Sequence, residues 1–278
     1  MSQVQFWALP KLKVAIALSN FLTVARKVLK LAAPLMLCLA MLIWSLPAQA
    51  ASRLDPRLEQ QVLQIIREHP EAILQSVEAY QQQQQQQLQK AQQGFLQQLR
   101  TDPKAIIGNS PTTGAEASKI VLVEFSDFEC PYCAEAQKTL KQFITKHREV
   151  LLVYKHFPLT SIHPEAMPAA KAAWAAGLQG KFWEYQDALF TQQDKLGESF
   201  YMATAENLNL DLERFNSDRN AATVAIGQDM QLAQSLGLSG TPFFVMSATG
   251  ASEGQAEIFT GAVQLSDLES ILARVSKS

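Results

Sequence analysis

Apolar and polar positions divide the chain into three parts with different periods. Residues 1–50 combine basic positions with one continuous apolar run. Residues 51–103 repeat apolar positions every three or four residues, which is the period of an amphipathic helix. From residue 104 onward, short apolar runs rich in β-branched residues alternate with helical patterns, as is typical of an α/β domain. The pattern predicts a leader, an all-α N-terminal arm and one α/β domain over residues 104–278.

The first 50 residues predict a signal peptide. They contain five Lys or Arg and no acid, followed by an apolar run from Leu31 to Leu46 and by Pro47-Ala48-Gln49-Ala50. This arrangement describes a secretory leader that is cleaved after Ala50. An uncleaved membrane anchor facing the same compartment is the alternative, although the run is shorter than the ~20 residues of a spanning helix. Either way we expect a periplasmic or otherwise extracytoplasmic domain, where disulfide chemistry occurs.

Residues 51–103 predict two helices. Asp55-Pro56 is a helix start, and His69-Pro70 ends the first helix and begins the second. The second pattern continues to about Leu99 and includes seven consecutive glutamines at 81–87. Such a tract is common in disordered chains. Glutamine is nevertheless a good helix former, and the apolar positions resume beyond the tract, so we expect one continuous helix.

The second helix carries an apolar stripe that repeats every 11 residues. This period corresponds to ~3.67 residues per turn and gives a straight or slightly right-handed seam. A lone helix this polar cannot bury its stripe, so we expect residues 51–100 to form an arm that pairs with copies of itself. The alternative is a monomer whose arm folds back on its own body. The stripe positions are Val77, Tyr80, Gln84, Leu88, Ala91, Phe95 and Leu99.

The strongest chemical signal is the sequence Cys-Pro-Tyr-Cys at 130–133. An apolar run from Ile120 to Phe125 predicts a buried strand, and a helical pattern from Cys130 to about Lys146 follows it. Cys130 then lies at a helix N-terminus, where unpaired N–H groups and the helix dipole stabilise a thiolate. Such settings lower a cysteine pKa from ~8.5 to as little as ~3.5. Cys133 lies one turn further on the same helix face and can close a short disulfide ring with Cys130.

A metal site is the alternative interpretation of two cysteines at this spacing. Two thiolates would need two more ligands to hold zinc. The third cysteine, Cys38, lies in the expected leader, and the four histidines show no paired spacing. We therefore expect redox chemistry, with no metal and no cofactor.

The remaining pattern completes an α/β domain. Val150 to Phe157 predicts a second strand, which a right-handed crossover through the helix makes parallel to the first. Residues 164–236 are helical in pattern, and their aromatic residues are expected in the core. A third strand begins at Gly240-Thr241-Pro242. Gln255 to Thr260 predicts the closing strand and Leu265 to Val275 the final helix.

Several separated motifs resemble the DsbA-like branch of the thioredoxin superfamily, over about residues 104–275. They are Glu124-Phe-Ser-Asp-Phe-Glu-Cys-Pro-Tyr-Cys133, Phe157-Pro158-Leu159, His163-Pro164, Gly180-Lys-Phe-Trp-Glu184 and Gly240-Thr241-Pro242. The resemblance implies a thioredoxin fold with a helical insertion at about 160–236. It also implies thiol–disulfide exchange, in which Cys130 forms the mixed disulfide and Cys133 resolves it. Less specifically, residues 51–100 resemble the helical extensions of oligomeric disulfide isomerases and of suppressor-of-copper-sensitivity C proteins.

The resemblance also implies roles for residues around the cysteines. It places a buried acid beneath the disulfide at Glu124, where a raised pKa would suit proton relay to Cys133. Strand alternation by itself leaves Glu124 open to being a surface carboxylate. At Thr241 and Pro242 the resemblance implies a cis-proline loop whose backbone pairs with an extended substrate peptide. Pro131 and Tyr132 are expected to tune the redox potential.

Two histidines, His156 and His163, are expected to be structural, although either could lie near the thiols and tune them.

Charge and family resemblance together define the expected partners. Removing the leader leaves 19 of the 24 basic residues against 26 acids, a net charge of −7, so we expect no nucleic-acid partner. The expected substrates are unfolded or misfolded exported proteins, with a membrane redox partner. Disulfide formation, isomerisation and reduction all remain open. A non-catalytic chaperone or Cu(I)-handling protein that uses Cys130 and Cys133 as ligands is the alternative from another class.

Overall fold

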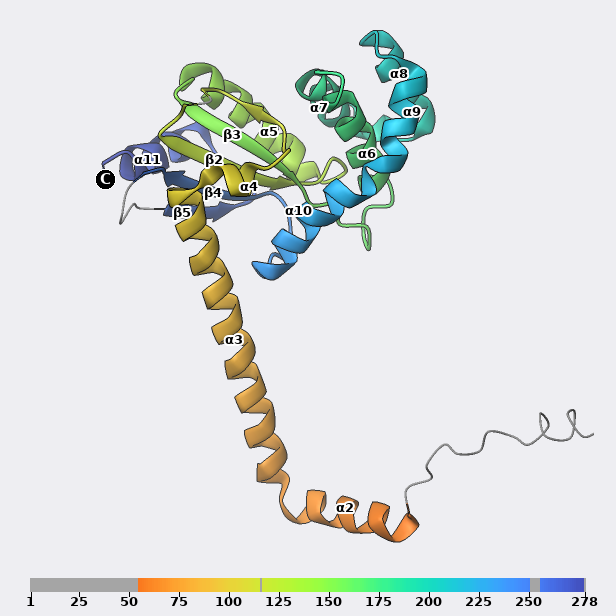
Figure 1. Cartoon of the computed structure of the whole chain (residues 1–278), viewed down its shortest axis with the longest axis vertical. Coiled ribbons are helices and arrows are strands. Elements are labelled where there is room, and N and C mark those ends of the chain that lie inside the picture. The colour runs from red at the N-terminus through yellow and green to blue at the C-terminus, as the bar shows by residue number, and fades with distance from the viewer. Residues whose placement is uncertain (1–54, 116, 251–255, 278) are drawn as a thin grey trace, which may run out of the picture. The chain divides into compact units, whose positions relative to one another are not determined.

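The computed structural model describes residues 55–115, 117–250 and 256–277 (Figure 1). The expected signal peptide, including Cys38, lies outside the described residues. The chain divides into two compact units after Ser76. Helix α3 (Pro70–Thr101) therefore begins in the first unit and ends in the second.

Helix α2 (Pro56–Glu68), in the first unit, begins where the sequence predicts. Its N-cap is Asp55, whose carboxylate accepts a hydrogen bond from the Arg57 N–H at 2.9 Å, and Pro56 follows at the first helical position. His69 ends the helix and α3 starts at the next residue. None of the α2 side chains is buried by other described residues, so the apolar face of α2 stays exposed.

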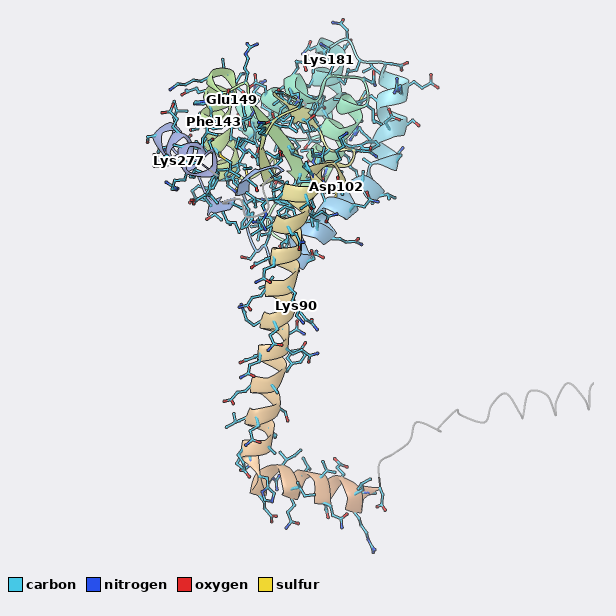
Figure 2. All side chains as sticks on the ribbon, turned by 60° about the vertical axis from the view of Figure 1, so that its left-hand side comes forward. Lys90, Asp102, Phe143, Glu149, Lys181 and Lys277 are labelled. Carbon is cyan, nitrogen blue, oxygen red and sulfur yellow. The ribbon has the colours of Figure 1, made fainter. Side chains whose placement is uncertain are left out.

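Helix α3 is one uninterrupted helix of 32 residues, and all seven glutamines lie inside it. The prediction of a helix rather than a disordered tract is confirmed. Lys90, labelled in Figure 2, belongs to the exposed stretch of α3, and Asp102 follows the end that meets the sheet. Phe95 and Leu99, near that end, are 5% and 0% exposed.

The last turns of α3 are covered by the protein's own body rather than by a second copy. Phe95 and Leu99 belong to one core with strand residues such as Val123. Leu88 packs so closely on Gly237 that a Cβ added there would lie 2.8 Å from it. The compact body begins at Val77, inside the segment 51–103 that the sequence predicts as an N-terminal arm. A long polar helix can be anchored by one buried end.

The segment from Asp102 to Thr113 contains a short helix and a short strand. Helix α4 (Pro103–Ile107) starts directly after Asp102. This Asp-Pro pair is a helix start, like the pair that opens α2. Strand β1 (Thr112–Thr113) pairs antiparallel with Leu152 and Val153 of an inner strand, β3 (Val150–His156).

Within the described residues the sheet has five strands in the order β1-β3-β2-β4-β5. Strands β2 and β3 are parallel, and helix α5 (Pro131–Lys146) forms the predicted crossover between them. The other neighbours are antiparallel. Every residue of β2 and β3 is buried because helices cover both faces of the sheet. The remaining strand bounds are β2 (Ile120–Ser126), β3 (Val150–His156), β4 (Phe243–Ala248) and β5 (Ala256–Thr260).

Two separate cores hold the helices against the sheet. On one face, Leu122 packs with Phe143 of α5 and Leu268 of α11 (Leu265–Val275). On the other face, Val123 packs with Leu99 of α3 and with α10 (Thr223–Ser235). Alternate residues of β2 thus enter different cores, as the period of a strand requires.

The helical insertion between β3 and β4 forms a third core, which includes both Cys130 and Cys133. Figure 1 shows α6 to α9 gathered beside the sheet, with α10 leading back toward it. The aromatic residues Phe182, Tyr185 and Phe190 are buried there, as expected for core residues. The described chain is thus a thioredoxin-like fold with a helical insertion, preceded by a helical N-terminal region. The insertion comprises α6 (Ala166–Gly177), α7 (Phe182–Thr191), η1 (Gln193–Lys195), α8 (Glu198–Asn207), α9 (Leu212–Ala221) and α10.

Replacing Leu99 by alanine tests whether the end of α3 belongs to the body. Because Leu99 is fully buried, Leu99→Ala should lower the free energy of unfolding by about 2–5 kcal/mol. Gln98→Ala, at the exposed neighbouring position, should change it by less than about 0.5 kcal/mol. Urea unfolding followed by circular dichroism measures both. Equal small losses in the two variants would show that this helix end is not part of the body.

Candidate active site

Cys130 and Cys133 lie where strand β2 passes into helix α5. Cys130 is the N-cap of α5, with an extended backbone at φ −76° and ψ 121°, and Pro131 occupies the first helical position. The Cys130 N–H donates to the Asp127 carbonyl at 3.2 Å, which closes the turn between strand and helix. The strand, the turn and the cysteines therefore have the arrangement that the sequence predicts.

Cys130 is held as the more acidic of the two thiols. Its pKa is lowered to about 5, first by the Cys133 side chain and then by Thr241 and the N–H groups of Cys133 and Tyr132, while burial opposes the shift. When protonated, the Cys130 thiol donates to the Thr241 carbonyl at 3.4 Å. An acidic thiol at the start of a helix is a nucleophile at neutral pH.

Cys133 has the opposite character. It is fully buried, and burial followed by the neighbouring Cys130 raises the pKa of its thiol. The Asp127 N–H donates to Cys133 Sγ at 3.5 Å. One thiol therefore ionises readily while its neighbour keeps its proton, which separates an attacking from a resolving sulfur.

Glu124 is fully buried in the middle of β2, so the surface alternative does not hold. Burial raises the pKa of its carboxyl to about 7, and the Ser126 side chain offsets part of the rise. Neither carboxyl oxygen has a hydrogen-bond partner among the described residues. In the sheet register Glu124 lies opposite Tyr154, another buried residue. A carboxyl that titrates near neutral pH can accept and return a proton.

Thr241 and Pro242 come from a distant part of the chain and lie beside Cys130. The Thr241–Pro242 bond is cis, as the family resemblance implied. Strand β4 begins at the next residue, Phe243, and its antiparallel pairing with β2 brings Thr241 to the active-site turn.

Pro131 and Tyr132, between the two cysteines, are both exposed, with Tyr132 64% exposed. The Tyr132 N–H helps to lower the pKa of Cys130. The tuning role of these two residues stays a prediction.

Asp127 organises the turn, a role that the sequence did not indicate. Its buried carboxylate accepts hydrogen bonds from the Glu129 N–H at 2.8 Å, the Leu159 N–H at 2.9 Å and His163 Nδ1 at 2.8 Å. His163 is thus near the thiols and serves a structural role. The Phe-Pro-Leu and His-Pro motifs contain two of its hydrogen-bond partners and were the available signals. The position of a motif in the chain, however, does not indicate which residue it contacts.

Gln193 is a second residue that the sequence did not indicate. Its side-chain amide, from η1, donates to the carbonyl oxygens of Phe128 at 2.8 Å and Cys130 at 2.9 Å. Nothing in a local pattern connects two positions so far apart in the chain.

His156 is a core residue. Burial, with a smaller contribution from Lys155, lowers its pKa to about 3, so the ring is neutral. It packs edge-on against Tyr154 and Phe182.

The thioredoxin family Thioredoxin_4 matches residues 107–263, which include both cysteines, Glu124 and the cis-proline loop. The chain belongs to this thioredoxin family.

Solved structures of thioredoxin-like proteins share this fold. A thioredoxin-like oxidoreductase from Silicibacter pomeroyi DSS-3 is 32% identical, with a TM-score of 0.55, and the match covers 62% of this chain and 94% of that one. Proteus mirabilis ScsC in a transitional conformation is 22% identical with a TM-score of 0.55, over 81% of this chain and 100% of that one. The thiol-disulfide exchange protein alpha-DsbA2 from Wolbachia pipientis is 21% identical with a TM-score of 0.54, over 68% of this chain and 95% of that one. At 22% and 21% identity, the last two matches show a shared fold and no more.

Curated relatives are much longer proteins. Na(+)/H(+) antiporter NhaA 3 of Salinispora tropica is 41% identical over 137 residues, which are 48% of this chain and 21% of the antiporter. The chain thus spans about a fifth of the length of the curated relatives it matches. In the part of this chain that the structure describes, no helix combines the length and apolar character needed to cross a membrane.

Glu124 gives the thioredoxin domain a characteristic dependence of stability on pH. Its folded-state pKa of about 7 lies above the ordinary 4.5, so between these values the folded chain binds the extra proton. The protonated Glu124 carboxyl therefore contributes fully to the free energy of unfolding below about pH 4.5, and this contribution is lost as pH rises through 7. Glu124→Gln cannot titrate. Its free energy of unfolding relative to the parent should rise by about 3 kcal/mol between pH 4.5 and 8.

Urea unfolding of the disulfide form, in which the thiols do not titrate, measures this difference. Glu206→Gln, which removes an exposed carboxylate from α8, is the matched control and should follow the parent at every pH. A Glu124→Gln curve parallel to the parent would contradict a buried carboxyl with a raised pKa.

Proposed function

We propose that this chain is an exported thiol–disulfide oxidoreductase that forms or isomerises disulfide bonds in exported proteins. The observation that carries the proposal is the unequal pair of thiols, with Cys130 acidic and Cys133 buried and protonated. Family membership and the thiol-disulfide exchange proteins among the similar folds support it.

The exchange begins when the Cys130 thiolate attacks a substrate disulfide. A mixed disulfide forms between Cys130 and one substrate sulfur, and the other substrate sulfur leaves as a thiolate. Cys133 then loses its proton to the Glu124 carboxylate and attacks Cys130 Sγ, which releases the second substrate thiolate. The Cys130–Cys133 pair is thereby oxidised by two electrons and the substrate is reduced. The reverse sequence oxidises a substrate dithiol.

Isomerisation uses only the first half of this sequence. A second thiolate of the same substrate attacks the mixed disulfide, so the substrate is rearranged and Cys130 returns as a thiolate. In both cases an extended substrate peptide pairs with the Thr241 backbone, next to Cys130. The low pKa of Cys130 favours its reduced form, which makes the matching disulfide a strong oxidant. A membrane redox partner maintains the redox state of the pair.

The exposed apolar residues of the N-terminal region favour assembly with copies of the same chain. Apolar surface of this extent on helices is characteristic of an interaction site. Sites on linked copies would face a shared substrate, which favours isomerisation. The residues are Leu58, Val62, Leu63, Ile65, Ile66, Ile73, Leu74, Val77 and Tyr80, each 40–63% exposed.

The competing function is a non-catalytic chaperone or Cu(I)-handling protein. It requires only that the two sulfur atoms act as ligands or lie beside a binding surface. It therefore predicts client or metal binding without any covalent intermediate.

Trapping the mixed disulfide separates these functions. With Cys133→Ala, a peptide whose single cysteine forms a disulfide with thionitrobenzoate should give a stable covalent adduct through Cys130. The aromatic thiolate leaves as a poor nucleophile, and neither the peptide nor the protein variant offers a second sulfur to resolve the adduct. Non-reducing electrophoresis and mass spectrometry detect the adduct. The rate of adduct formation should rise as pH passes the Cys130 pKa of about 5. Cys130→Ala is the control and should form none. A complete lack of adduct in Cys133→Ala, with client binding retained in Cys130→Ala, would overturn the proposal.

Charge substitutions on α2 test self-assembly without disturbing the body. Val62→Lys with Ile66→Lys should convert an oligomer into a monomer, because lysines cannot be buried in an apolar seam. Gln61→Lys with Gln64→Lys adds the same charge at exposed polar positions of α2 and should leave the mass unchanged. Light scattering measures the molar mass. A parent protein that is already monomeric would refute assembly through this region.

A further inference from the structure

One side chain of the helical insertion holds the active-site turn. Gln193 Nε2 donates to the Phe128 carbonyl at 2.8 Å and to the Cys130 carbonyl at 2.9 Å. Both partners are acceptors, so the nitrogen of the amide, and not its oxygen, faces them and uses both of its hydrogens. The two carbonyls flank Glu129, directly before the nucleophilic cysteine.

The peptide group between Phe128 and Glu129 is held at both ends. Gln193 binds its carbonyl, and Asp127 Oδ1 accepts a hydrogen bond from its N–H at 2.8 Å. Asp127 is in turn fixed by the loop after β3 through Leu159. The turn is thus clamped from two sides by elements that are distant in the chain.

The second carbonyl held by Gln193 is the one that starts helix α5. The Cys130 carbonyl also accepts hydrogen bonds from the N–H groups of Cys133 at 3.1 Å and Ala134 at 3.2 Å. Its direction therefore sets the direction of the first-turn N–H groups, which stabilise the Cys130 thiolate. A carbonyl oxygen carries partial negative charge, so one that rotates toward the sulfur would destabilise the anion.

We propose that Gln193 is a positioning residue that holds the turn before Cys130 in the conformation that favours the thiolate. The helical insertion thereby contributes to the redox strength of the site, beyond covering it. This inference rests on the proposed thiol–disulfide chemistry, and it assigns to the insertion a part of that chemistry.

The surroundings of Gln193 make it suitable for substitution. Its side chain is half-buried and lines a cleft of about 650 Å³ between α5 and the α7–η1 segment. Pro131 and Phe190 line the same cleft. Because the side chain borders open space rather than a packed core, a substitution leaves no sealed cavity.

Two variants separate hydrogen bonding from shape. Gln193→Leu removes both donors at similar size. Gln193→Glu keeps the shape but places acceptors and a negative charge against two carbonyls. Gln192→Leu is the matched control, since its amide interacts with Lys195 and not with the turn. Thiolate absorbance of the reduced protein gives the pKa of Cys130, and equilibration with glutathione gives the reduction potential.

Gln193→Leu should raise the Cys130 pKa by about one unit, and Gln193→Glu by more. Each unit corresponds to about a tenfold loss of oxidising strength, or about 30 mV. Gln192→Leu should match the parent.

Thermal unfolding of both redox forms distinguishes positioning from a general structural role. Loss of positioning should lower the melting temperature of the reduced form more than that of the disulfide form, because only the reduced form contains the thiolate. Equal losses in the two forms, with an unchanged Cys130 pKa, would overturn the role of Gln193 and leave the proposed function intact. A parent Cys130 that titrates near pH 8 to 9, as an ordinary thiol does, would refute the proposed function itself.

Discussion

The negative charge on Cys130 is the feature on which the rest of the structure depends. A thiolate is stable there first because the Cys133 side chain lies beside the sulfur. Thr241 and the first-turn N–H groups of helix α5, which begins at Cys130, stabilise it further. Burial would by itself favour the neutral thiol, and it does so at Cys133, one turn along. The two thiols therefore differ in acidity because Cys130 lies at the N-terminus of the helix and Cys133 lies one turn inside it. Strand β2, helix α5 and the cis-proline loop together fix the positions of the two sulfur atoms.

The active-site turn is stabilised from several parts of the chain at once. The carboxylate of Asp127 ties it to the loop after β3, and Gln193 ties it to the helical insertion. Thr241 approaches from the start of β4. Since such long-range hydrogen bonds fix peptide groups rather than side chains alone, they control the direction of the N–H groups around the sulfur. The insertion is thus part of the electrostatic environment of the site.

Helix α3 shows how one periodic stripe can be used in two ways. Its last turns complete the core on one face of the sheet, where Phe95 and Leu99 are buried. Val77 and Tyr80, on the same stripe, remain exposed. The same repeat therefore completes the core at one end of α3 and leaves apolar side chains exposed at the other. Glutamine between the two ends maintains the helix without adding apolar surface.

Much of this architecture was determined by the sequence alone, because strand and helix periods, proline positions and Cys-Pro-Tyr-Cys are local signals. They predicted β2, α5, β3 and α11 closely, and the motifs together indicated the thioredoxin fold. The burial of Glu124 could not be read from alternation, since helices cover both faces of the sheet and the usual contrast between faces disappears. Only the tertiary structure decided which surface covers the end of α3 and that Asp127 and Gln193 meet at the turn. Local periodicity shows that the apolar face of a helix or strand must be buried, and backbone chemistry requires that a carbonyl accept a hydrogen bond. Which residue buries the face or donates that bond depends on which distant segments the fold brings together.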